Sequence, residues 1–389
     1  MVFAIPLAWL QLQQDKLRLA IALLGVGFAV VLIFMQLGFQ EALFSSSVRF
    51  HHAFTYDITI ISPRTSFIGQ PRVFSRRRMY QALAHPDVTA VSSAYMSPTV
   101  WKNPSNPAEN RMIYVVGINP IEAVLDIPGV ERNLERIRLP DVALYDRLSR
   151  PEFGPVPELL ESSRKGGPAV FTEVGDRRIE IIDLYELGTS FGIDGSIVTS
   201  DLNFLRIFPN QPPGLINLGL VNLGPGADLE QVRAEIEASL PRDVEVLTRE
   251  QFVQREIDYW NQSTPIGYIF SFGVVVGLFV GSIIVYQILF ADVSDHLQEY
   301  ATLKAMGYSN GYLFSLVFQE AVLMAVLGFI PGFLLTLGLY SVAGDATALP
   351  MEMTTPRAIM VLLLTIAMCM ISGTIAMRKI RTLDPADIY

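Results

Sequence analysis

The sequence predicts an α+β membrane protein in which one transmembrane helix precedes a large extramembrane insert and three further transmembrane helices follow it. Half of the 389 residues are apolar and only 17% are charged. The apolar residues concentrate in four runs, each as long as the roughly 20 helical residues that cross a hydrocarbon core of about 30 Å. The predicted spans are residues 19–40, 259–291, 311–341 and 357–377. Most of the charge lies between the first two, in residues 41–258.

The first span is expected to be retained rather than cleaved as a signal peptide. A signal peptide has an apolar region of about 7–15 residues that ends at a small-residue cleavage site. Residues 19–40 form a longer run, and the segment Phe34-Met35-Gln36-Leu37 contains no such site. The amphipathic pattern of residues 1–18 predicts a cytoplasmic N-terminal helix before it.

Basic residues near the span ends predict the orientation, because lysine and arginine favour the cytoplasmic side. Lys16 precedes the first span, and Arg378 and Lys379 follow the last, so both termini and the tail, residues 378–389, are expected in the cytoplasm. The insert and the short loop at residues 342–356 are then periplasmic. The loop between the second and third spans fits less well, because its acidic residues outnumber Lys304.

Within the insert, local patterns predict a mixture of strands and helices. An alternating run at residues 56–62 predicts a strand, and residues 215–247 predict a β-α-β unit with Asp228 as the helix N-cap. Residues 120–168 are expected to form loops and short helices, and residues 173–208 short antiparallel strands. The insert is therefore predicted to hold two subdomains, one α/β and one mainly β, the second at about residues 120–210.

Two segments that flank the insert are expected to be stalk helices. Residues 36–54 contain no glycine after Gly38, and residues 248–260 open with Thr248 and Gln251 in the spacing of a capping box. Phe252 and Glu256 continue this second helix toward the second span. Because neither segment is a flexible Gly/Ser linker, we expect the stalks to join insert and membrane rigidly.

No catalytic, cofactor-binding or metal-binding residues are predicted. His51 and His52 are neighbours, whose side chains diverge by about 100° on a helix and do not easily share one ion. The glycine-rich phosphate loops GxGxxG and GxxxxGK[ST] are absent, and so is the nucleophile motif Gly-x-Ser-x-Gly. The net charge of −9 gives no support for nucleic-acid binding. The sequence therefore indicates that the chain is not an enzyme, although acid catalysis in the insert stays open.

One carboxylate lies inside a predicted span. Glu320 is in the third span, where a lipid-facing charge costs a few kcal/mol. A structural hydrogen bond to another span is the favoured interpretation, and a proton relay is the alternative.

The loop between the second and third spans contains a short amphipathic helix within residues 292–310. Asp295 is placed to cap its start and Gly307 to end it, with apolar residues along one side. The helix either lies on the membrane surface or docks a cytoplasmic protein. The candidate docking residues are Asp295, Leu297, Glu299, Tyr300, Leu303, Lys304 and Gly307.

This segment carries a family resemblance. Residues 298–309, QEYATLKAMGYS, resemble the segment R-E-I-[GA]-x-L-[KR]-A-[ILM]-G-[AY]-[ST] of ABC permeases of the FtsX/MacB type, with Gln298 where arginine is common. Glu320 with its neighbours and the tail segment Leu383-Asp384-Pro385-Ala386 resemble further parts of that family. Residues 34–39 and 60–63 look closest to its cyanobacterial DevC branch.

The resemblance implies a multi-pass protein of the cell inner membrane that works as the permease subunit of an export complex. Two copies of the permease would bind a cytoplasmic ABC ATPase dimer, which binds and hydrolyses ATP, so this chain itself needs no cofactor. The stalks would pass the motion to a periplasmic membrane-fusion adaptor and an outer-membrane TolC-like duct. The DevC branch implies export of glycolipid or another envelope-directed compound. An FtsX-like regulator of a cell-wall hydrolase and a membrane-tethered periplasmic enzyme are the alternatives.

Overall fold

The computed structural model describes residues 16–122 and 124–377, which belong to two compact units. One unit combines Met1–Ala42 with Pro265–Tyr389, and the other is Leu43–Thr264. Most of the predicted N-terminal helix, residues 1–15, and the whole tail, residues 378–389, lie outside the described residues.

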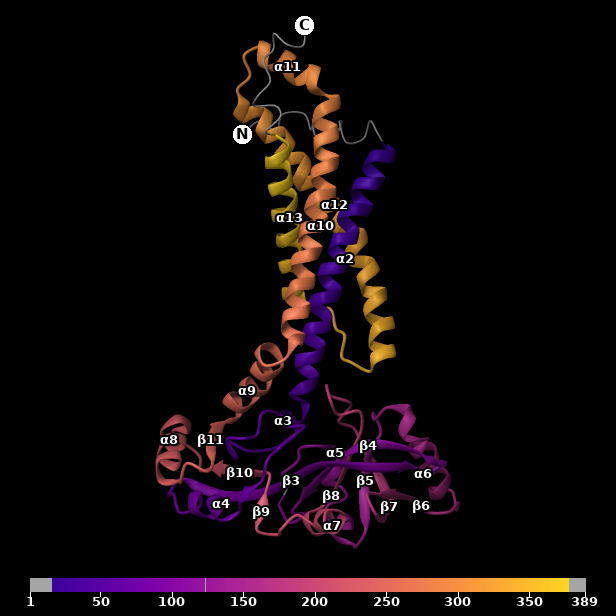
Figure 1. Ribbon diagram of the computed structural model, residues 1–389, viewed down its shortest axis with the longest axis vertical. Coiled ribbons are helices and arrows are strands. Elements are labelled where there is room, and N and C mark those ends of the chain that lie inside the picture. Colours follow the sequence, from indigo (N-terminus) through magenta and orange to yellow (C-terminus); the bar gives the residue numbers. More distant parts are fainter. Residues whose placement is uncertain (1–15, 123, 378–389) are drawn as a thin grey trace. The chain divides into compact units, whose positions relative to one another are not determined.

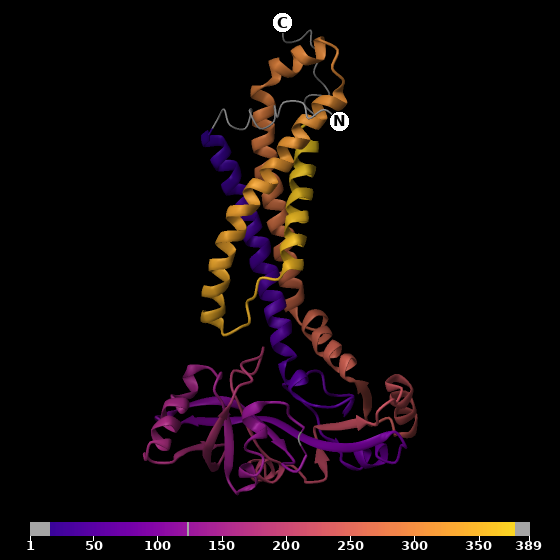
Figure 2. The ribbon, with the colours of Figure 1, turned by 180° about the vertical axis from the view of Figure 1, so that it is seen from behind.

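Within residues 16–122 and 124–377, four helices are long and apolar enough to cross a membrane (Figure 1). These are α2 (Lys16–Ser47), α10 (Pro265–Asp295), α12 (Asn310–Thr347) and α13 (Thr355–Ala376). A short helix, α11 (Leu297–Ala305), connects α10 and α12. Helix α13 packs against both α10 and α12, and it lies beside α10 in both views (Figures 1 and 2). The chain is therefore a multi-pass membrane protein with one span before the insert and three after it.

Glycines allow α2 and α12 to approach closely. A Cβ atom added at Gly332 would lie 2.8 Å from the carbonyl oxygen of Gly27, and one added at Gly328 would lie 2.6 Å from Cβ of Val26. Small residues at helix contacts let backbones approach in this way in membranes. Pro331 lies between them, and α12 continues through it.

The insert is built on a nine-stranded sheet in the order β11-β1-β10-β3-β4-β8-β5-β7-β6. Its strands are β1 (Ile58–Ile61), β3 (Val88–Asn103), β4 (Asn106–Ile118), β5 (Val142–Asp146), β6 (Val170–Val174), β7 (Arg177–Tyr185), β8 (Ser196–Ser200), β10 (Leu218–Leu223) and β11 (Glu245–Thr248). Strands β2 (Phe74–Ser75) and β9 (Leu215–Ile216) form a separate pair.

Both faces of this sheet are covered. Successive residues of a strand point to opposite faces. Along β4, Ile113 and Val115 enter one apolar cluster, whereas Tyr114 and Val116 enter another. The covering helices are α3 (Arg49–Ala53), α4 (Arg77–Ala82), α5 (Pro128–Glu131), α6 (Val156–Arg164), α7 (Asp201–Ile207), α8 (Leu229–Ser239) and α9 (Arg249–Gln262), with the 3-10 turns η1 (Arg136–Arg138) and η2 (Pro151–Phe153).

The predicted β-α-β unit is confirmed. Asp228 is the N-cap of α8, and its side chain accepts a hydrogen bond from the backbone N–H of Gln231 at 3.0 Å. Strands β10 and β11 both run antiparallel to β1, which lies between them, so they are parallel to each other. The two parallel strands of the unit, β10 and β11, therefore lie on either side of β1, which comes from the start of the insert.

Two local predictions in the insert were right in part. Residues 120–168 contain the predicted short helices, α5, η1, η2 and α6, and residues 173–208 contain β7 and β8, which pair antiparallel with β6 and β5. Residues 120–168 also contain β5, which the loop prediction missed because all five of its residues are buried and show no alternation. Residues 173–208 also contain helix α7, whose N-cap Ser200 accepts from the N–H of Asn203 at 3.2 Å. The predicted division near residues 120–210 does not divide the sheet, because β8 pairs in parallel with β4.

Candidate functional site

The short helix α11 has a well-defined C-terminus. Gly307 has φ of +94°, the left-handed conformation that favours glycine. Its N–H donates to the carbonyl of Lys304 at 3.1 Å, and the N–H of Tyr308 donates to the carbonyl of Leu303 at 3.1 Å. These two bonds form a Schellman motif, which ends the helix where the sequence predicts.

The start of α11 differs from the prediction. Its N-cap is His296, not Asp295, because α10 extends through Asp295. The Nδ1 atom of His296 lies 3.0 Å from the carbonyl oxygen of Asp292 and 3.6 Å from the carboxylate of Asp292. Asp295 is therefore the last residue of a long helix and not the cap of a short one.

The candidate docking residues separate into two groups. Tyr300 is buried among the helices, with Leu297, Leu303 and Lys304 half-buried. Asp295, Glu299 and Gly307 are exposed. The second group is fully accessible to a partner, whereas Tyr300 and Leu303 pack in the apolar cluster of the membrane helices.

Sequence reasoning missed two apolar residues beside this group. Met306 and Tyr308 are 63% and 46% exposed and flank Gly307. Exposed methionine and tyrosine are typical of protein interfaces. Their position at the end of the amphipathic pattern was the available signal. The exposed surface at the end of α11, meaning Glu299 on the helix and Met306, Gly307 and Tyr308 directly after it, is thus acidic at one point and apolar at another.

Glu320 contacts a second carboxyl group. Glu320 as a residue is 2% exposed, Asp292 is 6% exposed, and their side chains are hydrogen-bonded. A hydrogen bond between two carboxyl groups requires a proton on one of them. The bond joins α12 to α10 close to the start of α11, an arrangement that fits a structural role between spans.

The capping box predicted for the second stalk helix is present at the start of α9. The Thr248 hydroxyl accepts from the N–H of Gln251 at 3.2 Å, and the Gln251 side chain accepts from the N–H of Thr248 at 3.0 Å. Phe252 is buried, with its ring centroid 4.3 Å from that of His51 on α3. Helices α3 and α9, which lie near the two ends of the insert sequence, therefore contact each other within its fold.

Glu256, one turn further along α9, lies at the centre of a buried network. Its carboxylate accepts from the N–H of Ile68 at 2.8 Å and from Nε1 of Trp260 at 2.9 Å. Nε2 of His51 lies 3.6 Å away. Burial raises the pKa of Glu256 to about 7, although the two hydrogen bonds by themselves lower it. Burial, with the nearby His52, lowers the pKa of His51 to about 3.

The two adjacent histidines behave differently. His51 is fully buried against α9, whereas His52 is exposed, so their rings point apart. The sequence predicts only that the two side chains diverge. The contact that matters instead joins His51 to Glu256, 205 positions away, a separation that no local pattern reports.

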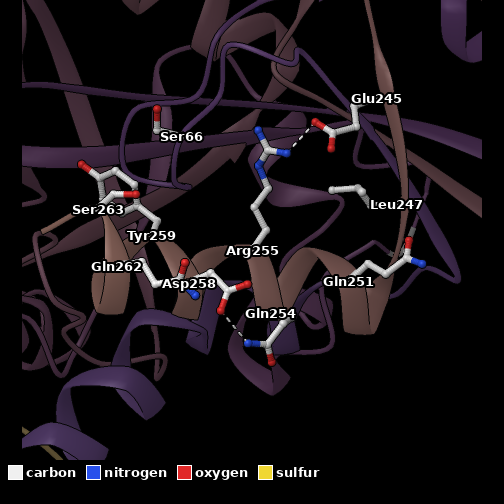
Figure 3. Close-up of a pocket in the computed structure, with 10 residues that line it drawn as sticks. All are labelled: Ser66, Glu245, Leu247, Gln251, Gln254, Arg255, Asp258, Tyr259, Gln262 and Ser263. Carbon is white, nitrogen blue, oxygen red and sulfur yellow. Dashed lines mark hydrogen bonds and ion pairs between the residues drawn. The ribbon is translucent and has the colours of Figure 1, made fainter. Parts of the chain in front are cut away.

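An open groove of about 510 Å³ runs beside α9 (Figure 3). Arg255 donates to Glu245 at 2.5 Å and to the carbonyl of Thr65 at 2.9 Å, while Gln254 donates to Asp258 at 2.8 Å. The remaining lining residues are Ser66, Leu247, Gln251, Tyr259, Gln262 and Ser263. Its arginine is thus engaged, and the groove presents amide, hydroxyl and carboxylate groups suited to hydrogen bonding.

A comparison with protein families finds a match over the region that contains α11, α12, α13 and most of α10. Residues 271–385 match the family model described as FtsX-like permease C-terminal. None of the curated proteins compared with the chain matches it.

Two solved structures resemble part of the chain. The periplasmic region of MacB from Actinobacillus actinomycetemcomitans is 9% identical with a TM-score of 0.36, covering 52% of this chain and 94% of that one. The extracellular domain of the noncanonic ABC-type transporter YknZ from Gram-positive bacteria is 10% identical with a TM-score of 0.34, covering 50% and 99%. Such low scores carry no functional inference. By the family match, residues 271–385 are similar to the C-terminal region of FtsX-like permeases.

Proposed function

We propose that this chain is the permease subunit of an ATP-driven export complex of the inner membrane. The observation that carries the proposal is α11, a short helix with a defined end and an exposed acidic and apolar surface, inside the region that matches an FtsX-like permease. The membrane topology of one span, an insert and three spans supports it.

In this proposal α11 is the cytoplasmic docking helix for an ABC ATPase dimer, and two permease copies bind that dimer. Glu299 supplies a charged contact, and Met306 and Tyr308 supply apolar ones. ATP is bound and hydrolysed by the partner.

The insert is then periplasmic and meets a membrane-fusion adaptor, which leads to a TolC-like outer-membrane duct. Helix α2 continues past Ala42 without a break, and α9 is separated from α10 only by Ser263 and Thr264. Continuous or nearly continuous helices pass on displacement better than flexible linkers do. The exported compound is glycolipid or another envelope-directed molecule.

The docking assignment is tested with a Glu299→Lys, Leu303→Ala double variant. The charge reversal opposes the partner, and the truncation loosens a half-buried contact of α11. We expect the co-purified ATPase to fall at least tenfold while the permease still inserts. Asp345→Lys, an exposed charge reversal at the other end of α12, is the matched control. Unchanged ATPase recovery in the double variant would reject the docking role of α11.

The periplasmic partner is tested by affinity purification of the full chain from native membranes. Recovery of a membrane-fusion adaptor supports export. Recovery of a cell-wall hydrolase in its place would replace this proposal with the FtsX-like regulator.

A further inference from the structure

The insert contains an arginine-lined pocket that the proposed function does not use. Its volume is about 420 Å³, and its charged lining residues are Arg132, Arg147, Arg164, Asp183 and Glu186. We propose that this pocket is a binding site for a phosphate group.

The three arginines come from three different elements. Arg132 follows α5, Arg147 follows β5, and Arg164 is the last residue of α6. The sheet and its covering helices hold these positions at one pocket, since β5 pairs with β7 and both α5 and α6 pack on β7. Residues 32 positions apart in the chain therefore present guanidinium groups to a common space.

Arg132 is the arginine most available to a ligand. Its Nε donates to the carbonyl of Pro128 at 3.0 Å. Among residues 16–122 and 124–377 it forms no ion pair, so its two terminal nitrogens are not committed to a carboxylate. A guanidinium with two free terminal nitrogens matches two oxygens of a phosphate.

The two carboxylates of the pocket differ in how firmly they are bound. Asp183 accepts from the N–H of Leu184 and from Nδ2 of Asn133, both at 2.9 Å, and it pairs with Arg164. The pair between Arg147 and Glu186 spans 3.3 Å with both side chains about 60% exposed. Exposed pairs of this kind contribute little, so a stronger anion can take over Arg147.

The pocket lining has a net positive charge, whereas the insert as a whole has a net negative charge. Residues 43–264 hold 22 Lys and Arg against 28 Asp and Glu, a net charge of −6. The pocket lining holds three arginines against two carboxylates. Excess positive charge concentrated in a concave site of an acidic domain favours a small anion over an extended acidic surface.

The test uses the full-length protein in detergent, with pyrophosphate titrated by calorimetry at low salt. We expect saturable binding that weakens as salt is raised, because exposed charges are screened. Arg132→Gln should weaken binding at least tenfold. Glu186→Gln should strengthen it severalfold, because it removes a repelling carboxylate and frees Arg147. Arg138→Gln is the matched control, since Arg138 is an exposed arginine on the neighbouring turn η1 and does not line the pocket.

The source of the phosphate is settled by a second pair of titrations. Water-soluble short-chain phosphatidic acid is compared with short-chain phosphatidylcholine and with inorganic phosphate. Preference for phosphatidic acid assigns a lipid headgroup, and equal binding of inorganic phosphate assigns a soluble phosphate compound. No saturable binding of any phosphate, or equal losses in Arg132→Gln and Arg138→Gln, overturns the proposal. A failure of ATPase docking at α11 would leave this result unaffected.

Discussion

Glu256 is a buried carboxyl group in the insert, and its burial changes the pH at which it loses its proton. The carboxyl is 2% exposed and is held between α9, α3 and the segment at Ile68. Water is excluded from Glu256 and from its neighbour His51, so burial favours the neutral form of each side chain. The chemistry of this contact is therefore that of a neutral histidine beside a carboxyl that titrates near neutrality.

This pKa predicts a pH dependence of stability. The folded pKa of Glu256, about 7, exceeds the ordinary value of 4.5. Its stabilising contribution is therefore complete below about pH 4.5 and is lost as pH rises through about 7. We expect Glu256→Gln, which stays neutral, to gain about 2 to 3 kcal/mol relative to the native chain between pH 5 and pH 8. Thermal unfolding of both proteins across that range measures the difference.

The titration of His51 changes the stability in the opposite direction with pH, and its contribution must be separated from that of Glu256. Its folded pKa of about 3 lies below the ordinary 6.5, so its contribution is complete above pH 6.5 and is lost as pH falls toward 3. The histidine is present in both proteins and cancels in the comparison. A pH-independent difference between the native chain and Glu256→Gln would show that Glu256 titrates normally.

The α2, α12 and α13 helices are joined by one arginine near their ends. Arg357 lies in the first turn of α13, where a positive charge opposes the helix dipole. Its guanidinium pairs with Glu41 of α2 and donates to the hydroxyl of Tyr340 on α12 at 3.1 Å and to the carbonyl of Glu352 at 2.8 Å. Tyr340 in turn donates to the carbonyl of Phe34 at 2.5 Å.

The two charges of this pair are predicted to differ in importance. Arg357 is 4% exposed and Glu41 is 54% exposed. Arg357→Met should destabilise the membrane helices by about 2–4 kcal/mol, because it also removes the bonds to Tyr340 and Glu352. Glu41→Gln should cost only about 1 kcal/mol, since its side chain is about half exposed. Unfolding of the full chain in mixed micelles, with the double variant completing a cycle, measures both. Equal costs would show that Glu41 is the only significant partner of Arg357.

The end of α11 gives a second prediction at this scale. A Cβ at Gly307 would have no neighbour within 4 Å, so Gly307→Ala tests the backbone conformation alone. At φ of +94° the alanine should cost about 1 kcal/mol and fray the last turn. Faster amide hydrogen exchange in residues 303–308 is the expected readout. Gly311→Ala, within α12, is the control and should leave that exchange unchanged.

Local signals predicted elements well, and they failed where burial removed the pattern. The capping box of Thr248, the cap at Asp228 and the stop at Gly307 each depend on residues within a few positions of one another. Strand β5 lacks alternation because both its faces are covered. Arg357 and Glu41 are 316 positions apart, so their pairing could not be inferred from either local sequence.

Across the whole molecule, chain topology explains why the insert forms one unit. Strand β1 lies near the start of the insert, whereas β10 and β11, which pair with it on both sides, lie near its end. The β8 strand continues the same sheet from β4 through a parallel pairing. The composition predicted a large domain between spans, yet the single sheet depends on pairings among distant segments, which patterns in one sequence do not specify.

This closure predicts that the insert folds without the membrane helices. Residues 43–264, expressed alone, contain all nine strands and both apolar clusters, so we expect a soluble monomer that unfolds cooperatively. Residues 43–214 are the matched comparison: they keep β1 and β3 but lose β10, which lies between them, and β11. That fragment should aggregate or lack dispersed amide resonances, because β1 would have no partner on either side. If the shorter fragment folded equally well, β10 and β11 would be accessory to the sheet and not the strands that close it.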